Sequence, residues 1–220
     1  MQKFSVLEII GPRMIGPSSS HTAGAARLAH VAYKLAGGGV KSAEITLYGS
    51  FAETGRGHGT DKALIAGILG MEPDDENLRV SPEIARERGV DIRIMFSDEL
   101  VEAPNTARIK TVNSKGEVSE LVGVSVGGGN IIVTELNGMK LKFTGEYPTL
   151  VLRHHDVPGV ITSVTGILAK EQINVAFMRV FRHVKRQDAY MVIETDTPVP
   201  ERTIALIKDW CPEITEVKAL

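Results

Sequence analysis

The sequence is poor in three features that often decide the class of a protein: cysteine, net charge and long apolar runs. Its 220 residues include one cysteine, Cys211, and 25 basic against 27 acidic side chains, which gives a net charge of -2. A single thiol forms no intrachain disulfide, and it builds neither a zinc finger nor an iron–sulfur cluster, which usually takes three or four thiolates. The near-neutral charge argues against a nucleic-acid partner. Any cluster chemistry would need cysteines from another chain.

Long apolar segments are also missing. The longest stretch without Asp, Glu, Lys or Arg is residues 121–134, whereas a membrane helix needs about 20 mostly apolar residues. The N-terminus lacks the continuous apolar stretch and the small-residue cleavage site of a signal peptide. We therefore expect no membrane partner and a cytoplasmic location, where one free thiol and seven methionines suit the reducing conditions.

Helical and strand patterns alternate along the first two thirds of the chain. Residues 22–36 are rich in alanine, carry apolar side chains at helical spacing and end at three glycines, so we expect an amphipathic helix there. β-branched runs over 106–145, interrupted by turn residues, predict antiparallel hairpins. The other expected elements are a strand at 43–52, a glycine-rich loop at 53–59, helices at 61–70 and 81–88, and a strand at 90–96.

A different pattern begins near Gly145 and runs to the C-terminus. The expected elements are strands at 149–154, 174–183, 187–195 and 213–218, with helices at 158–171 and 200–210. This βαββαβ order is that of the ferredoxin-like split unit, a topology that hosts many functions. The sequence thus predicts an α/β (α+β) fold with two domains, an α/β domain at 1–147 and a ferredoxin-like domain at 148–220.

A first candidate site lies directly before the alanine-rich helix, at Ser18-Ser19-Ser20-His21. Backbone amides and hydroxyls at a helix start favour an anion, so a carboxylate or a phosphate would fit there. The alternative is an ordinary N-cap. Three serines and a histidine exceed what a cap needs.

A second candidate site surrounds His58, which stands between Gly57 and Gly59 and just before the expected helix N-cap at Thr60 or Asp61. Glycines permit close backbone approach to a ligand. The positive end of a helix disfavours imidazolium, so His58 is a candidate for a neutral base near pH 7. The alternative is a histidine in a flexible surface loop. The glycine spacing fits neither the dinucleotide fingerprint nor the phosphate loop.

A third candidate site is the turn Asp156-Val157-Pro158-Gly159, followed at a distance by Asn174. Pro158 and Gly159 shape a loop whose N–H groups would hold the carboxylate of an amino acid, and Asn174 would accept from its ammonium group. The alternative is a purely structural turn. A metal site at His154 and His155 is disfavoured, because adjacent residues on a strand face opposite sides. We expect no metal ligand in this chain.

The chain closely resembles the β chain of the iron–sulfur-dependent L-serine dehydratases, over essentially its whole length. The motifs that carry the resemblance are Ile15-Gly16-Pro17-Ser18-Ser19-Ser20-His21-Thr22, Tyr48-Gly49-Ser50 and Gly57-His58-Gly59-Thr60-Asp61-Lys62. In the two-chain bacterial members this chain ends in an ACT domain, which residues 148–220 resemble. The N-terminal part resembles the allosteric substrate-binding domain of some phosphoglycerate dehydrogenases.

The resemblance implies conversion of L-serine to pyruvate and ammonia, in complex with an α chain that carries a [4Fe-4S] cluster whose open iron can take the substrate hydroxyl. It implies His58 as the base, with His21 as the alternative. The implied substrate-binding residues are Ser18, Ser19, Ser20, Thr60 and Asp61, and the implied effector-binding residues of the ACT domain are Asp156, Pro158, Gly159 and Asn174. Two ACT domains are expected to pair through exposed sheet edges. The competing interpretation is a regulatory chain that senses serine without catalysis.

Overall fold

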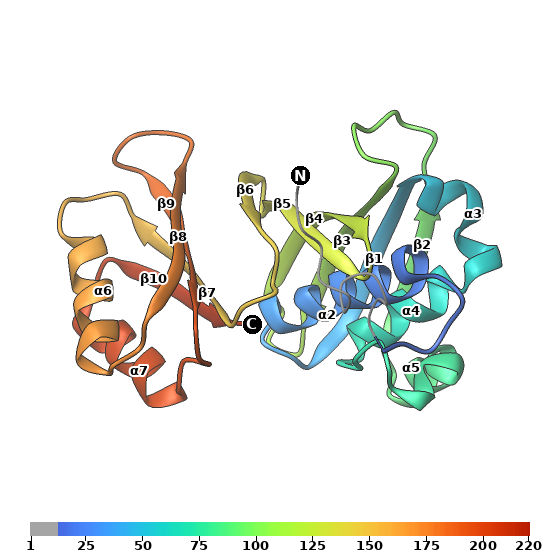
Figure 1. Cartoon of the computed structure of the whole chain (residues 1–220), viewed down its shortest axis with the longest axis horizontal. Coiled ribbons are helices and arrows are strands. Elements are labelled where there is room, and N and C mark those ends of the chain that lie inside the picture. Colours follow the sequence, from blue (N-terminus) through green and yellow to red (C-terminus); the bar gives the residue numbers. More distant parts are fainter. Residues whose placement is uncertain (1–12) are drawn as a thin grey trace, which may run out of the picture. The chain divides into compact units, whose positions relative to one another are not determined.

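The structure, a computed structural model, describes residues 13–220. The chain divides into two compact units, Met1–Gly138 and Met139–Leu220. Both combine helices with a sheet (Figure 1), so the expected mixed α/β fold class is confirmed. No helix in the described part of the chain is long and apolar enough to cross a membrane.

The first unit is built on a six-stranded sheet in the order β2-β1-β3-β4-β5-β6. Its strands are β1 (Val40–Gly49), β2 (Asp91–Phe96), β3 (Asn105–Asn113), β4 (Val118–Gly127), β5 (Asn130–Leu136) and β6 (Met139–Phe143). β6 pairs in this sheet although its residues fall in the second compact unit. β1 is parallel to β2, whereas β3, β4 and β5 form the expected antiparallel hairpins. The tight turn before β6 is Asn137-Gly138, with φ angles of 48° and 78°, as a type I′ hairpin turn requires.

Helices of the first unit pack on this sheet and on one another (Figure 1). They are the π-helical turn η1 (Ser19–Gly24), α2 (Ala25–Leu35), α3 (Ser50–His58), α4 (Thr60–Ile68), the 3-10 turn η2 (Glu76–Val80) and α5 (Ser81–Glu87). α2 and α4 approach so closely at Gly67 that an added Cβ there would lie 2.3 Å from the Ala26 carbonyl oxygen. The small residues of the alanine-rich helix therefore set the spacing of these two helices.

The expected glycine-rich loop at 53–59 is wrong, because these residues are mostly helical. β1 ends at Gly49, whose φ of 53° turns the chain, and α3 follows at once from Ser50 to His58. Phe51 and Gly55 lie one turn apart on α3 and are both buried. Their packing outweighs the helix-propensity cost of glycine, about 1 kcal/mol per residue. The expected N-cap at Thr60 or Asp61 is also wrong, since α4 is preceded by Gly59 with a left-handed φ of 68°.

The second unit has the expected βαββαβ order. Its elements are β7 (Thr149–His155), α6 (Val160–Lys170), β8 (Val175–Arg182), β9 (Asp188–Thr195), α7 (Glu201–Trp210) and β10 (Ile214–Ala219). The strands form a sheet in the order β10-β7-β9-β8, with β7 antiparallel to β9 and to β10. Leu150 and Leu152 of β7 pack with apolar residues of both helices, such as Leu168 and Ile207. This core holds α6 and α7 on one face of the sheet.

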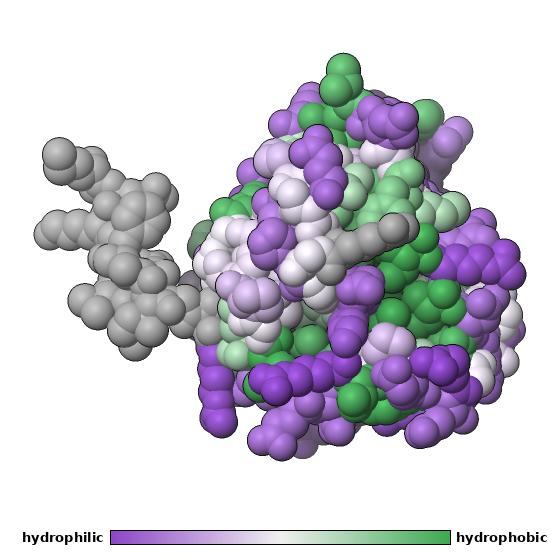
Figure 2. All heavy atoms as spheres, turned by 90° about the vertical axis from the view of Figure 1, so that its right-hand side faces the viewer, coloured by the Kyte–Doolittle hydropathy of each residue, from purple (hydrophilic) through white to green (hydrophobic). Residues whose placement is uncertain are grey.

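The surface of the first unit mixes polarity on the face shown in Figure 2, where hydrophilic and hydrophobic residues are interspersed. Each unit also exposes a large apolar side chain over most of its surface. In the first unit Leu100, between β2 and β3, is 97% exposed, and in the second unit Trp210, at the end of α7, is 75% exposed. The segment that carries Leu100 borders the cavity described below.

Candidate functional site

Two histidines from separate elements meet in the first unit. His21 lies in η1 and His58 is the last residue of α3, and their ring centroids are 4.9 Å apart at an interplanar angle of 35°. The Thr22 hydroxyl donates to the His58 carbonyl oxygen at 3.2 Å, which joins the two segments. The rings of His21 and Phe51 make a T-shaped contact, with centroids 5.3 Å apart and an interplanar angle of 73°. The structure thus brings together the first and second candidate sites.

Two hydroxyl residues of α3 hold these rings, and sequence reasoning missed both of them. His21 Nε2 lies 3.0 Å from Thr54 Oγ1 and 3.3 Å from Ser50 Oγ. Nδ1 of His58 lies 3.1 Å from the Thr54 carbonyl oxygen. Thr54 stands four residues before His58, the spacing at which helical residues are neighbours. This spacing relates Thr54 to His58 only when residues 50–58 are helical, and the low helix propensity of glycine argues against a helix in the sequence.

The position of His58 differs from the one expected. It ends α3 instead of beginning α4, so the positive end of a single helix does not act on it in the expected way. Burial lowers the pKa of His21 below its ordinary value of 6.5, and the nearby His58 lowers it further, against an opposing effect of the Ser50 carbonyl. His21 is therefore mainly neutral at pH 7.

The serine motif forms a π-helical turn in place of a regular helix start. Ser18 is the N-cap, because its hydroxyl accepts from the His21 amide at 3.1 Å. Its carbonyl oxygen accepts from the amides of Thr22 and Ala23 at 2.9 and 3.4 Å. Three amides of the turn are thus directed at Ser18 itself, whereas the amides of Ser19 and Ser20 have no acceptor among residues 13–220.

The hydroxyls of Ser19 and Ser20 have no hydrogen-bond partner among residues 13–220, and both residues are half-buried. The turn itself is fixed against β4, since the Ser125 hydroxyl donates to the Ser20 carbonyl oxygen at 3.0 Å. A Cβ at Gly24 would lie 2.0 Å from Ser125 Oγ, so only glycine fits at this contact. The motif therefore offers two unengaged hydroxyls on a backbone held firmly in place.

Thr60 and Asp61 follow His58 at the start of α4. Thr60 is fully buried, and its hydroxyl has no hydrogen-bond partner within the described part of the chain. It lies beside Gly55, where an added Cβ would come within 3.5 Å of Thr60 Oγ1. Asp61 is half-buried in the first turn of α4. Of these two residues, only Asp61 is accessible to a ligand in this structure.

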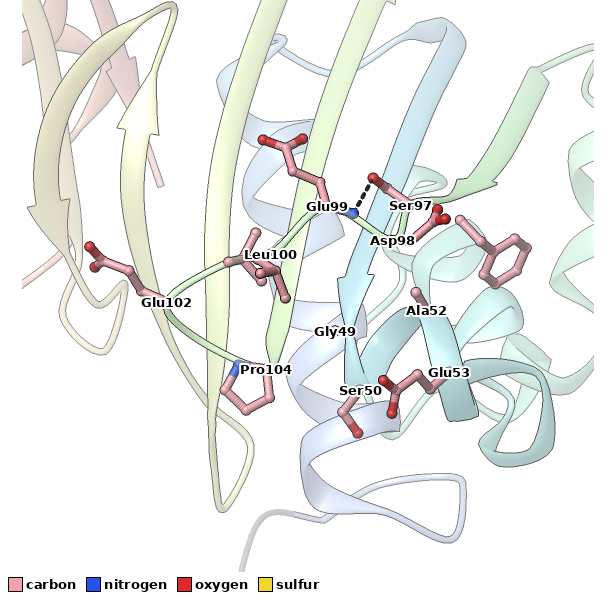
Figure 3. Close-up of a pocket in the computed structure, with 12 residues that line it drawn as sticks. Gly49, Ser50, Ala52, Glu53, Ser97, Asp98, Glu99, Leu100, Glu102 and Pro104 are labelled. Carbon is pink, nitrogen blue, oxygen red and sulfur yellow. Dashed lines mark hydrogen bonds between the residues drawn. The ribbon is translucent and has the colours of Figure 1, made fainter.

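A cavity of about 660 Å³ lies next to this site and shares Ser50 with it (Figure 3). It opens between the start of α3 and the segment 97–104, in which the Glu99 amide donates to Ser97 Oγ at 3.2 Å. Four carboxylates and no Lys, Arg or His line it: Glu53, Asp98, Glu99 and Glu102. Such a lining repels the carboxylate of an amino acid. We therefore assign the candidate active site to the histidine pair and the serine turn.

The third candidate site, the turn at residues 156–159, is held by hydrogen bonds within the second unit. The Asp156 carboxylate accepts from the Arg182 guanidinium at 2.6 Å and from the Arg186 amide at 3.0 Å. The Arg186 amide, followed by Arg182, holds the pKa of Asp156 below its ordinary value. Pro158 and Gly159 are exposed beside it, and Gly159 has a left-handed φ of 98° before α6.

Asn174 does not join this turn within one chain. It precedes β8, whose first residue Val175 pairs with Thr195, whereas His155 at the end of β7 pairs with Asp188. The two registers put Asn174 and the turn at opposite ends of the sheet. The Asn174 amide donates to the Asp196 carboxylate at 2.7 Å.

Cys211 does not fit an iron–sulfur cluster. It is fully buried in the apolar core of the second unit, and burial, together with nearby Glu213, raises the pKa of its thiol. A cluster ligand must be a thiolate, which such surroundings disfavour. Among residues 13–220, no group of three or more His, Cys, Asp and Glu side chains is arranged to hold a metal ion.

Comparison with known proteins decides the family. A family model described as "Serine dehydratase beta chain" matches residues 5–89, and an ACT domain model matches residues 149–209. The chain is 46% identical over 204 residues to "Probable L-serine dehydratase, beta chain" of Bacillus subtilis, which covers 93% of this chain and 92% of the relative. The chain belongs to the L-serine dehydratase beta chain family. This confirms the resemblance inferred from the serine and histidine motifs.

Other members and neighbours agree with this assignment. "L-serine dehydratase, beta chain" of Peptoniphilus asaccharolyticus is 37% identical over 91% of both chains. A D-3-phosphoglycerate dehydrogenase of Synechocystis sp. is 26% identical over 85% of this chain but only 32% of its own length. This chain is thus also similar to a segment of a longer protein of another name.

Proposed function

We propose that this chain is the beta subunit of an L-serine dehydratase and acts with an alpha chain to convert L-serine to pyruvate and ammonia. The observation that carries the proposal is the pair His21 and His58, held 4.9 Å apart beside the Ser19 and Ser20 hydroxyls in a beta chain of this family. A base next to unengaged donors is what elimination from an amino acid requires.

The division of labour between the two chains follows from the donors present here. We propose that a [4Fe-4S] cluster belongs to the alpha chain, because the one thiol of this chain is buried and its pKa is raised. A Lewis acid for the β-hydroxyl would then come from the partner. The reducing conditions that such a cluster needs agree with a cytoplasmic location.

His58 is the proposed base. Its Nδ1 faces the Thr54 carbonyl oxygen, so Nε2 is the nitrogen open to the α-proton of serine. That proton moves to Nε2, the β-hydroxyl leaves as hydroxide and takes up a proton to become water, and the product is aminoacrylate. Aminoacrylate tautomerises to the imine, which one water hydrolyses to pyruvate and ammonia. His21 is the alternative base, and its lowered pKa keeps it neutral at pH 7.

The serine turn is the proposed holder of the substrate carboxylate and ammonium groups. Ser19 and Ser20 contribute hydroxyls and amides, whereas Ser18 acts indirectly as the cap that shapes the turn. Asp61 is the proposed partner of the ammonium group. Thr60 contributes only if binding of the alpha chain or of serine exposes its hydroxyl.

The test is anaerobic assembly of this chain with its cognate alpha chain, followed by iron analysis and a pyruvate assay. We expect an iron-bearing complex that forms pyruvate from L-serine, and His58→Ala lowers kcat by about 10²-fold to 10⁴-fold, the usual loss for a general base. The control is His155→Ala, an exposed histidine of the second unit whose ring pairs with Asp188. Near-normal turnover by His58→Ala would eliminate His58 as the base and leave His21 to be tested in the same way.

A serine sensor is the second candidate function, favoured by the similarity to a phosphoglycerate dehydrogenase segment. A sensor predicts tight serine binding by the isolated chain without any partner. Isothermal titration of the isolated chain with L-serine and with L-alanine, repeated on the His58→Ala variant, separates the two candidates, because serine that binds the ACT domain is unaffected by this substitution. The dehydratase proposal predicts weak binding at the histidine pair until the alpha chain is present.

Pairing of two ACT domains is a further part of this proposal. β8 is an edge strand of the four-stranded sheet and exposes Phe177 and Val180, which supports self-association along that edge. We propose serine as the effector, bound near Asp156, Pro158 and Gly159 of one copy, a site that Asn174, at the opposite end of the sheet, would reach only from the second copy. Sedimentation and hydrogen exchange of residues 148–220, each with and without serine, test it. Unchanged results in both would mean that the domain is structural.

A further inference from the structure

The histidine pair is held by one residue that contacts both rings. Thr54 contacts His21 through its hydroxyl and His58 through its backbone carbonyl. We propose that Thr54 is a positioning residue that fixes the two histidines in opposite neutral tautomers. This inference rests on the proposed dehydratase function only for its catalytic consequence, and the tautomers themselves can be measured without it.

The tautomer of His21 follows from counting hydroxyl hydrogens. Thr54 Oγ1 lies 2.8 Å from the Ser50 carbonyl oxygen, which can only accept, so the single hydroxyl hydrogen of Thr54 points there. Toward His21 Nε2, 3.0 Å away, Thr54 then has only a lone pair to offer. We infer that Nε2 carries the hydrogen and donates it to this closer oxygen, while Ser50 Oγ, 3.3 Å from Nε2, is a second and more distant acceptor for the same hydrogen. Neutral His21 is the Nε2–H tautomer, with its lone pair on Nδ1.

The tautomer of His58 follows from the second contact. Its Nδ1 lies 3.1 Å from the Thr54 carbonyl oxygen, which again can only accept. Nδ1 therefore carries the hydrogen, and the lone pair of neutral His58 is on Nε2. The two rings, whose centroids are 4.9 Å apart, thus expose different nitrogens although they share one supporting residue.

The arrangement has a consequence for catalysis. A general base must present a lone pair to the proton that it removes, and the tautomer decides which nitrogen can do so. The Thr54 carbonyl prepares His58 Nε2 for that role, while the Thr54 hydroxyl keeps the neighbouring His21 ring in one orientation against Phe51. One turn of α3 therefore sets both rings before substrate arrives.

The test uses the full chain labelled with ¹⁵N-histidine and long-range ¹H–¹⁵N correlation spectra, which distinguish the two neutral tautomers. We expect the Nδ1–H pattern for His58 and the Nε2–H pattern for His21, with exposed His155 as the internal reference. Thr54→Val removes the hydroxyl, keeps the carbonyl and has nearly the same volume. It is expected to abolish the fixed tautomer of His21 and to leave His58 unchanged, and Thr54→Ser is expected to restore the wild-type spectrum.

Two results would overturn the proposal: an Nε2–H pattern for His58 in the wild-type chain, or a His21 pattern that Thr54→Val does not alter. If Thr54→Val does not fold, as judged by circular dichroism, Thr54→Ala replaces it in the same comparison. If Thr54→Val and Thr54→Ala both fail to fold and the spectrum of Thr54→Ser also differs from that of the wild type, Thr54 supports the fold and the proposed positioning role is overturned.

Activity supplies an independent measurement. In the complex with the alpha chain, Thr54→Val is expected to lower kcat by roughly 10-fold and to change KM by less than about 3-fold, as for loss of one hydrogen bond that holds the His21 ring beside the proposed base His58. Equal changes in kcat and KM would contradict positioning. If the wild-type complex forms no pyruvate, the proposed function fails, whereas the tautomer measurements still decide the assignment of Thr54.

Discussion

The close approach of α2 and α4 makes a sharp prediction for Gly67→Ala. An added Cβ at Gly67 would lie 2.3 Å from the Ala26 carbonyl oxygen, 2.6 Å from Ala29 Cβ and 2.7 Å from the His30 amide nitrogen. Two of these three atoms belong to the backbone of α2 and cannot rotate away. The helices would have to separate by about 1 Å to restore ordinary contacts.

The size of the effect follows from two opposing contributions. Replacing a helical glycine by alanine stabilises a helix by about 0.5–1 kcal/mol. Inserting a methyl group into a closely packed contact costs about 1–3 kcal/mol. We therefore expect Gly67→Ala to lower the free energy of unfolding by about 1–2 kcal/mol and the Tm by roughly 2–8 °C for a chain of this length.

The measurement is urea unfolding of the full chain followed by circular dichroism, with hydrogen exchange of residues 25–68 to locate the effect. The matched control is Gly166→Ala on α6, where an added Cβ meets no atom within 4 Å. This variant should be more stable than the wild type by up to about 1 kcal/mol. If Gly67→Ala is as stable as Gly166→Ala, the two helices are not in the close contact described.

Three further predictions concern single residues. The Arg186 amide and Arg182 lower the pKa of Asp156, so this carboxylate stabilises the fold above its unfolded-state pKa near 3.8 and stops doing so as the pH falls through its folded-state pKa. The urea midpoints of Asp156→Asn and of the wild type should therefore converge in acid. A difference between the midpoints that stays constant with pH would contradict this prediction. Cys211→Ala should leave the iron content of the assembled complex unchanged, and loss of iron would make Cys211 a ligand. Asn137→Ala should lower the free energy of unfolding, measured by chemical denaturation, by about 1 kcal/mol, since alanine tolerates a positive φ less well than asparagine. An unchanged free energy of unfolding would mean that the turn changes its conformation in the variant.

The sequence was sufficient for the second unit because each of its elements has a simple pattern. Leu150 and Leu152 alternate on a strand, Val160, Val164 and Leu168 repeat at helical spacing, and turn residues separate the elements. Here local propensity and tertiary packing favour the same structure.

The sequence was not sufficient for α3 and for the residues that hold the histidines. Glycine is the weakest ordinary helix former, so residues 53–59 resembled a loop, and only burial of Phe51 and Gly55 against the rest of the unit makes them helical. Ser50 and Thr54 therefore carried no visible relation to His21, which is 29 and 33 residues away in the chain. The candidate histidines could be predicted from their motifs, but their supports depend on tertiary structure.

The π-helical turn at Ser19–Gly24 contains one residue more per hydrogen-bonded turn than an α-helix does. Deleting one residue from it would convert the turn to a tighter, better-bonded helix. The same deletion would rotate every preceding side chain by about 100° around the axis of α2, because an α-helix has 3.6 residues per turn. His21 would then leave the side of the helix that faces α3. The less favourable π-helical backbone thus keeps the His21 side chain on the side of the helix that faces α3. Members of this family that have both histidines should therefore also have a turn of the same length.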